Sequence, residues 1–104
     1  MNRNSNLPLT ETFFYILLAV RTPMHGYAIM QKIEELSGGQ VRLAAGTMYG
    51  AIENLLKKGL IVSVKSDDAR RKLYTLTPLG KSVLEDDYQR MKHMICILEK
   101  EMKQ

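Results

Sequence analysis

The chain has 104 residues, a formal net charge of +4, one cysteine and no tryptophan. This length suits a single domain, and the lone Cys96 excludes an intramolecular disulfide. The longest apolar stretch, FFYILLAV at 13–20, is too short to cross a bilayer, and the start of the chain lacks a secretory signal pattern. We therefore expect a cytoplasmic protein without membrane contact, and its basic charge is compatible with a polyanionic partner.

Two helices are expected in the first forty residues. One covers 11–21 with Thr10 as its N-cap, and it is apolar on nearly every side. Such a helix must be covered by other elements over most of its surface. Pro23 breaks the chain before a second helix over 26–37, which the Gly-Gly pair at 38–39 ends. The buried stripe of this second helix is expected to contain Ile29, Ile33 and Leu36.

A short strand, a third helix and a β-hairpin are expected next. QVRL at 40–43 alternates polar and apolar residues as a strand does. A helix follows over 47–58, and Gly59 stops it. The β-rich runs LIVSV (60–64) and KLYTL (72–76) flank a polar segment, and this pattern predicts a hairpin.

A fourth helix is expected from residue 78 to about residue 103. Thr77 is a favourable N-cap, and Pro78 fits the first helical position. A helix of this length extends beyond what so small a core can cover. The order of elements predicts a mainly α (α+β) fold. It comprises a winged helix-turn-helix with a two-stranded wing over 1–77, followed by a C-terminal dimerisation helix over 78–104.

The third helix places apolar and polar residues on opposite faces. The core-facing stripe consists of Met48, Ile52, Leu55 and Leu56. The opposite face carries Gly50, Asn54 and Lys57, and Thr47 and Tyr49 lie on its flanks. In a winged helix-turn-helix this outward face enters the DNA major groove, so these five residues are candidate DNA contacts.

Gly50 is unexpected inside a helix, because glycine there costs roughly 0.5–1 kcal/mol relative to alanine. Without a Cβ, the backbone can approach a phosphate or a base edge closely. Asn54 can pair with adenine, and Lys57 and the two flanking hydroxyls can contact phosphates. The alternative is a tolerated surface glycine beside an ordinary Glu53–Lys57 ion pair.

The expected hairpin has a basic tip. Its cations are Lys65, Arg70, Arg71 and Lys72. Wings of this kind contact phosphates or the minor groove, so we predict DNA contacts here. The alternative is solubilising charge at the end of a hairpin, which Asp67 and Asp68 partly neutralise.

Three motifs in series resemble the PadR family of transcriptional regulators. They are PMHGYAIMQKIEE (23–35), GTMYGAIENLLKKGLI (46–61) and RRKLYTLTPLGK (70–81). The resemblance implies a winged helix-turn-helix dimer, most often a repressor, that binds an inverted-repeat operator in double-stranded DNA. It also implies the compact branch of the family, which has one long helix in place of a separate C-terminal domain.

The resemblance assigns particular residues as well. Thr47 and Tyr49 fall on the GTxY motif of the recognition helix. The turn that opens the second helix, HGY, consists of His25, Gly26 and Tyr27, and Tyr27 is counted among the candidate DNA contacts. Many members have proline where this chain has Gly50. Some compact relatives stack flat drug molecules between tryptophans, which this chain lacks.

The long helix carries an apolar stripe with spacings of 4, 3, 4, 3 and 4 residues, which is the pattern of a helix that packs against a partner. The stripe consists of Leu84, Tyr88, Met91, Ile95, Leu98 and Met102. With Phe13 and Phe14 it predicts a homodimer interface; the alternative is an intramolecular core helix. A small hydrophobic effector between Met91, Met94, Ile95 and the first helix is a further hypothesis, and plain packing is its alternative.

These features predict a homodimeric, sequence-specific DNA-binding transcriptional regulator, namely a repressor released by a small molecule or another signal. The alternative is a winged-helix protein-protein interaction module without DNA binding. No cofactor and no metal site are predicted, because one cysteine and two distant histidines, His25 and His93, cannot assemble a zinc site. No catalytic constellation can be built from these residues, so an enzyme is not expected.

Overall fold

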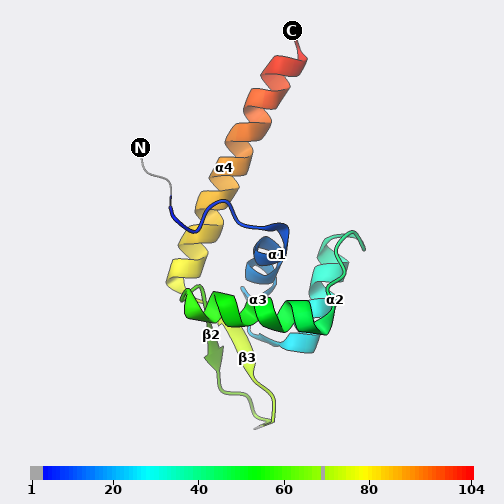
Figure 1. Ribbon diagram of the computed structural model, residues 1–104, viewed down its shortest axis with the longest axis vertical. Helices are drawn as coiled ribbons and strands as arrows, with labels where there is room; N and C mark the ends of the chain where they lie inside the picture. The colour runs from blue at the N-terminus through cyan, green and yellow to red at the C-terminus, as the bar shows by residue number, and fades with distance from the viewer. Residues whose placement is uncertain (1–3, 69) are drawn as a thin grey trace.

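The computed structural model describes residues 4–68 and 70–104. Over these residues it contains four helices and a three-stranded sheet, and the predicted mainly helical α+β architecture is confirmed. In chain order the elements are α1 (Glu11–Ala19), β1 (Met24–His25), α2 (Gly26–Leu36), α3 (Ala45–Lys57), β2 (Ile61–Val64), β3 (Leu73–Leu76) and α4 (Pro78–Met102). Figure 1 shows a compact body made by the first six elements, from which α4 projects.

Two predicted N-caps are present as expected. The Thr10 hydroxyl accepts a hydrogen bond from the Phe13 backbone N–H, with an N–O distance of 3.1 Å. The Thr77 hydroxyl accepts one from the Gly80 N–H at 2.9 Å and donates to the Gly59 carbonyl oxygen at 2.6 Å. Thr77 therefore caps the start of α4 and also links it by a hydrogen bond to Gly59, in the connection between α3 and β2.

The sheet is antiparallel with the strand order β1-β3-β2, so β3 is the central strand. The hairpin β2–β3 was expected, whereas β1 was missed in the sequence. In β1, Met24 lies opposite Tyr74, and His25 lies opposite Leu73. A strand of two residues has no periodicity, and its partner is some fifty residues away in the chain. The wing is thus joined to the turn that precedes α2.

The predicted strand at QVRL, 40–43, is wrong, because this segment is an irregular loop. Its alternation comes from two anchors: Val41 is buried, and Leu43 packs partly against the core. The Val41 N–H donates to the Ser37 hydroxyl at 2.9 Å instead of joining a sheet. Leu36 also departs from expectation, since it is 41% exposed at the last turn of α2 while the rest of its stripe is buried.

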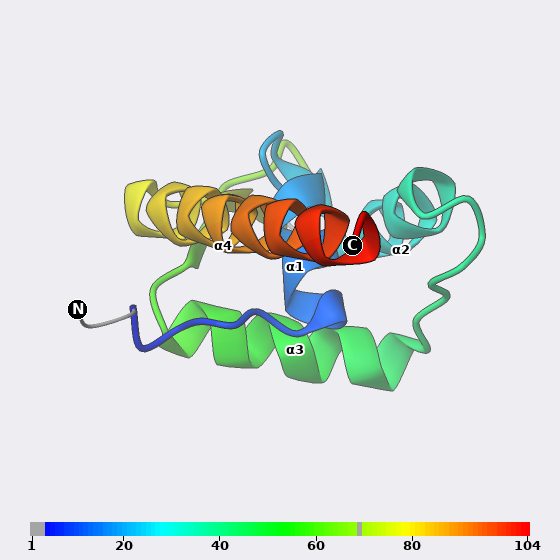
Figure 2. The same cartoon turned by 90° about the horizontal axis from the view of Figure 1, so that it is seen from above.

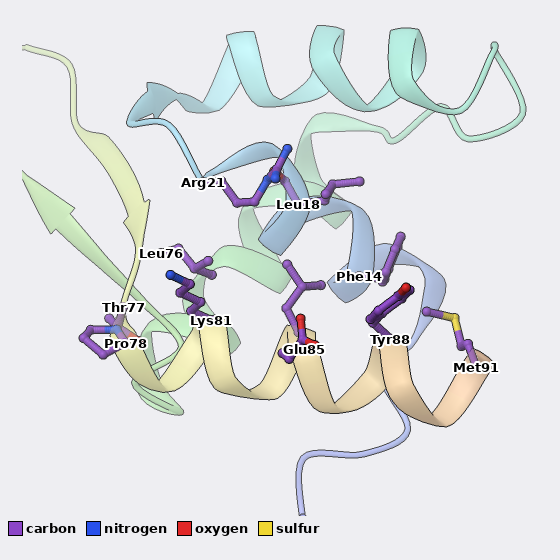
Figure 3. Close-up of a pocket in the computed structure, with 11 residues that line it drawn as sticks. Phe14, Leu18, Arg21, Leu76, Thr77, Pro78, Lys81, Glu85, Tyr88 and Met91 are labelled. Carbon is purple, nitrogen blue, oxygen red and sulfur yellow. The ribbon is translucent and has the colours of Figure 1, made fainter. Parts of the chain in front are cut away.

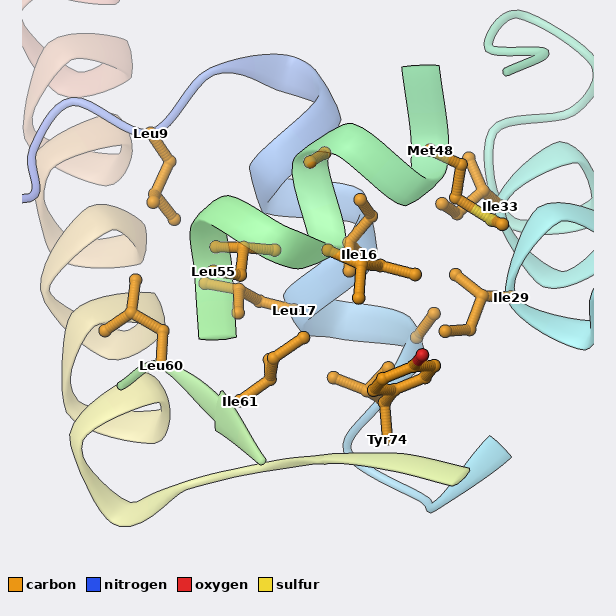
Figure 4. Close-up of a cluster of buried hydrophobic side chains, with 14 of the residues drawn as sticks. Leu9, Ile16, Leu17, Ile29, Ile33, Met48, Leu55, Leu60, Ile61 and Tyr74 are labelled. Carbon is orange, nitrogen blue, oxygen red and sulfur yellow. The ribbon is translucent and has the colours of Figure 1, made fainter. Parts of the chain in front are cut away.

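The core is built around α1. Ile16, Leu17 and Val20 have no solvent exposure. Helices α2, α3 and α4 all contact α1, and Figure 2 shows it between α4 and α3. Figure 4 shows side chains of α2, α3 and the sheet closing around it. The expectation that this apolar helix is covered on most sides is therefore confirmed.

Helix α4 has a buried half and an exposed half. Gly80, Val83 and Asp87 are buried against the body, and Arg90 Nε donates to Asp87 Oδ1 at 2.6 Å. From Lys92 to the C-terminus every residue is exposed. The molecule is consequently elongated, with principal extents of 57, 32 and 21 Å. None of the helices among the described residues has the length and apolarity to cross a membrane.

Gly80 on α4 and Gly50 on α3 allow a test of how closely each helix packs at these positions. A Cβ built on Gly80 would overlap the Leu60 carbonyl oxygen, whereas a Cβ on Gly50 would have no atom within 4 Å. We expect Gly80→Ala to lower the free energy of unfolding by about 3 kcal/mol, because the backbone at Leu60 would have to move to make room for the new Cβ. Gly50→Ala should raise it by roughly 0.5 kcal/mol through helix propensity. Urea unfolding at one protein concentration measures both, and equal stability of the two variants would contradict this packing.

Candidate nucleic-acid interface

The predicted division of α3 into a buried and an exposed face is confirmed. Met48 and Leu55 have no exposure and Ile52 has 1%. The opposite side of the helix is open to solvent along its whole length. Its exposed residues are Thr47, Tyr49, Gly50, Glu53, Asn54 and Lys57.

Contacts within the chain do not account for Gly50. No atom of the described residues lies within 4 Å of the position that its Cβ would take, so packing does not require a glycine there. The ordinary alternative for this face, an ion pair between Glu53 and Lys57, is not formed among residues 4–68 and 70–104. The outer surface of α3 is therefore free to meet another molecule with both its backbone and its charges.

The cations of the wing are held at the end of the β2–β3 hairpin. Asp68 shapes this turn: its Oδ1 accepts from the Arg70 N–H at 2.9 Å, and its carbonyl oxygen accepts from the Arg71 N–H at 3.0 Å. Both arginines are exposed, as are Lys65 and Lys72. In the part of the chain that the structure describes, none of these four cations forms a salt bridge. Their charge is thus presented to solvent.

Helix α3 and the wing meet at a shallow pocket of about 400 Å³, which we call the junction pocket. Its lining residues are His25, Gly26, Tyr27, Tyr49, Arg70, Arg71, Lys72 and Tyr74. Five of these eight were predicted from the sequence as DNA contacts, and the structure brings them together. The other predicted contacts lie elsewhere: Thr47, Gly50, Asn54 and Lys57 along α3, and Lys65 just after the end of β2.

Three residues of the junction pocket were not predicted as DNA contacts. His25 has a structural role, because its Nδ1 donates to the Lys72 carbonyl oxygen over 3.2 Å and so holds the wing to the turn before α2. Gly26 and Tyr74 contribute through contacts between distant parts of the chain. The motif HGY could have drawn attention to Gly26, but nothing in the alternation of LYTL singles out Tyr74.

Tyr74 is a buried tyrosine that lines the junction pocket. It is only 8% exposed, and burial raises the pKa of its hydroxyl above the usual value near 10. The neighbouring hydroxyl of Tyr49 raises this pKa further. The two tyrosines, one on α3 and one on β3, thus lie close to each other and both line the junction pocket.

A second, larger groove of about 860 Å³ lies between α1 and α4 (Figure 3). Four residues of the predicted dimer interface line it, namely Phe14, Leu84, Tyr88 and Met91. Beyond its end, Ile95, Leu98 and Met102 are 57%, 58% and 75% exposed. Phe13 points elsewhere, because neighbouring residues on a helix are rotated by about 100°, and it lines a small pocket with Pro8 and Leu60.

The predicted effector residues do not enclose a single cavity in one chain. Met91 lines the groove, whereas Met94 and Ile95 lie past it, with exposed fractions of 47% and 57%. Among the residues that the structure describes, no group of three or more histidine, cysteine or acidic side chains is placed to hold a metal ion.

A helix-turn-helix whose exposed third helix is flanked by a basic β-hairpin defines the winged-helix class of DNA-binding proteins. Residues 16–86 match the model of the transcriptional regulator PadR-like family. The chain therefore belongs to the PadR-like family, whose members are transcriptional regulators that bind DNA and are not enzymes.

Two relatives match about two thirds of the chain in sequence. A 37.1 kDa protein encoded in a transposon of Streptomyces fradiae is 39% identical over 69 residues, and protein X of Lysinibacillus sphaericus is 31% identical over 72 residues. Each match covers 66% of this chain, but it spans 19% of the length of the first relative and 66% of the second.

Solved structures agree as well. A PadR family transcription regulator from Clostridium difficile superposes with a TM-score of 0.74 at 26% identity, covering 89% of this chain and 99% of that one. A PadR family transcriptional regulator from Eggerthella lenta, at 24% identity, shares the fold with a TM-score of 0.67 over 88% of this chain and 80% of that one.

The raised pKa of Tyr74 makes stability depend on pH above about 10. Because the folded state holds this proton more tightly than the unfolded state, the contribution is complete below the unfolded pKa and is lost as pH rises through the folded one. We expect Tyr74→Phe to lose less free energy of unfolding than the wild type as the pH rises above about 10.

An ultraviolet titration of tyrosinate checks the same point. Tyr74→Phe should remove a component that ionises above the ordinary tyrosine range, while Tyr27→Phe, which removes a tyrosine that is 67% exposed, should retain it. Persistence of that component in Tyr74→Phe would show that another tyrosine carries it.

Proposed function

We propose that the protein is a homodimeric, sequence-specific repressor that binds an inverted-repeat operator in double-stranded DNA and is released by a small molecule or another signal. The observation that carries the proposal is the junction pocket, where the exposed face of α3 and the uncompensated cations of the wing meet on one side of the molecule. A recognition helix flanked by positive charge is what a major groove between two phosphate backbones requires.

In this proposal α3 enters the major groove with Gly50 nearest the DNA. The missing Cβ lets the backbone approach, Asn54 pairs with a base edge, and Lys57 contacts a phosphate. The Thr47 hydroxyl contacts a phosphate near the start of the helix, where the helix dipole also favours an anion. Lys65 and the basic run Arg70–Lys72 contact the neighbouring backbone, and the exposed Tyr27 lies beside them.

The dimer is supported by the free half of α4. Its apolar side chains are about half exposed or more in the part of the chain that the structure describes, and they continue the line of the groove between α1 and α4. A second copy related by a two-fold axis would bury both stripes at once. Two recognition helices would then face successive major grooves about 34 Å apart, as an inverted-repeat operator requires.

Release by a ligand is supported by the position of the α1–α4 groove. It is mostly lined by apolar side chains, and its end at Met91 borders the proposed dimer stripe. A hydrophobic effector that wedges between Met91, Met94, Ile95 and α1 would change how the two copies pack. Each recognition helix is packed in the same domain as the α1–α4 groove of its own copy. A change in how the two copies pack would therefore alter the spacing of the two recognition helices on DNA.

Replacing Arg70 and Arg71 with alanine tests the DNA-binding wing. We expect weaker binding to every duplex, and the slope of log affinity against log salt should fall by about 2 because two phosphate contacts are lost. Fluorescence anisotropy with duplexes selected from a random library measures both. Lys100→Ala with Lys103→Ala is the matched control, since it removes the same charge at the far end of α4 and should leave the slope unchanged.

An affinity that does not depend on salt, in the wild type as in the variants, would contradict the proposal. That result would favour the protein-interaction module instead.

Charged substitutions at Met91 and Ile95 test the dimer. We expect Met91→Glu with Ile95→Glu to give monomers near 11.9 kDa that lose operator binding, because two charges would be buried in the interface. His93→Glu, on the exposed back of the same helix, should remain dimeric. Sedimentation equilibrium gives the masses, and identical masses for wild type and double variant would exclude this interface.

A further inference from the structure

The contact between Gly26 and Tyr49 is unusually close. A Cβ built on Gly26 would lie 2.5 Å from Tyr49 Oη and 2.8 Å from Cζ. The end of the tyrosine ring therefore lies directly over the first residue of α2. This position is accessible only because residue 26 has no side chain.

The conformation of the backbone does not explain this glycine. The positive φ angles among the described glycines belong to Gly38, Gly39 and Gly59, so the backbone at Gly26 is one that alanine adopts freely. Gly26 also begins α2, where alanine would be favourable for the helix. What an added Cβ would meet is the far end of the Tyr49 side chain, which rotates easily.

Because its ring lies over Gly26, the Tyr49 side chain extends toward the wing. There it lies close to Tyr74, which is 8% exposed and lines the same pocket. The Tyr74 hydroxyl makes no hydrogen bond to any part of the chain that the structure describes, and the His25 side chain gives α2 no N-cap hydrogen bond. Hydroxyls and helix-start N–H groups that lack partners, beside Arg70, Arg71 and Lys72, form an environment suited to an anion.

We propose that Gly26 is a positioning residue for DNA binding: its missing Cβ lets Tyr49 lie across the start of α2, where the Tyr49 and Tyr74 hydroxyls together donate to one DNA backbone phosphate. The proposal rests on the proposed function, since the phosphate is that of the operator. The contact fixes the angle between α3 and the wing on the duplex, because the two hydroxyls come from these two elements. It carries no sequence information of its own.

Four variants of the full chain test this inference: Gly26→Ala, Tyr49→Phe, Tyr49→Ala and Gly26→Ala with Tyr49→Ala. Anisotropy is measured with a duplex selected by the wild type and with a scrambled duplex of equal composition. We expect Gly26→Ala and Tyr49→Phe each to weaken binding about tenfold on both duplexes, as the loss of a hydrogen bond to a charged group does. The slope against salt should not change, because no cation is removed.

The double variant separates positioning from a general structural role. If Gly26 acts through Tyr49, adding Gly26→Ala to Tyr49→Ala should weaken binding no further. Thermal unfolding should show Gly26→Ala to be as stable as the wild type, because only a side chain tip is displaced. If Gly26→Ala does not fold, Tyr49→Phe alone still tests the hydroxyl contact.

Several results would overturn the inference while leaving the proposed function intact. They are wild-type affinity in Gly26→Ala or Tyr49→Phe, additive losses in the double variant, and a loss confined to the selected duplex, which would indicate a base contact. If the wild type binds neither duplex, the proposed function itself fails.

Discussion

The structure depends on the burial of α1. This helix is apolar on nearly all sides, so its stability requires α2, α3 and α4 to close around it. The same packing determines the orientation of α3, since Met48, Ile52 and Leu55 must face inward and the remaining surface of that helix must face outward. The segment that follows α1 is fixed to β3 as well, because the carbonyl oxygen of Val20 accepts a hydrogen bond from the Leu76 N–H at 3.0 Å. The outward face of α3 is thus a consequence of the core.

Local signals in the sequence were sufficient for most of the fold. Hydrophobic spacing located the helices, threonine and proline located the start of α4, and β-branched runs located the hairpin. The failures were of two kinds. At 40–43, two buried anchors in a loop imitated the alternation of a strand. At Met24–His25, pairing with a distant strand produced an element that has no local pattern at all.

The candidate site divides in the same way. Residues on one helix face, such as Asn54 and Lys57, could be grouped from the sequence because helical geometry is regular. The contact between Gly26 and Tyr49 could not, since it joins two helices whose relative placement is set by the core. Phe13 and Phe14 show the limit within a single helix: both are apolar, but only Phe14 reaches the groove beside α4. Which of the two phenylalanines lines the groove can be told only from the folded structure.

The small strand β1 has a consequence for how the molecule can adapt to a partner. It pairs with β3 and leads directly into α2, and His25 adds a side-chain link to the Lys72 carbonyl oxygen. The base of the wing and the helix-turn-helix are therefore joined into one frame by backbone pairing and by a side-chain hydrogen bond. Because the contacts of this frame exist before a partner binds, association costs little conformational entropy there. A curved or irregular surface would have to conform to this protein more than the protein conforms to it.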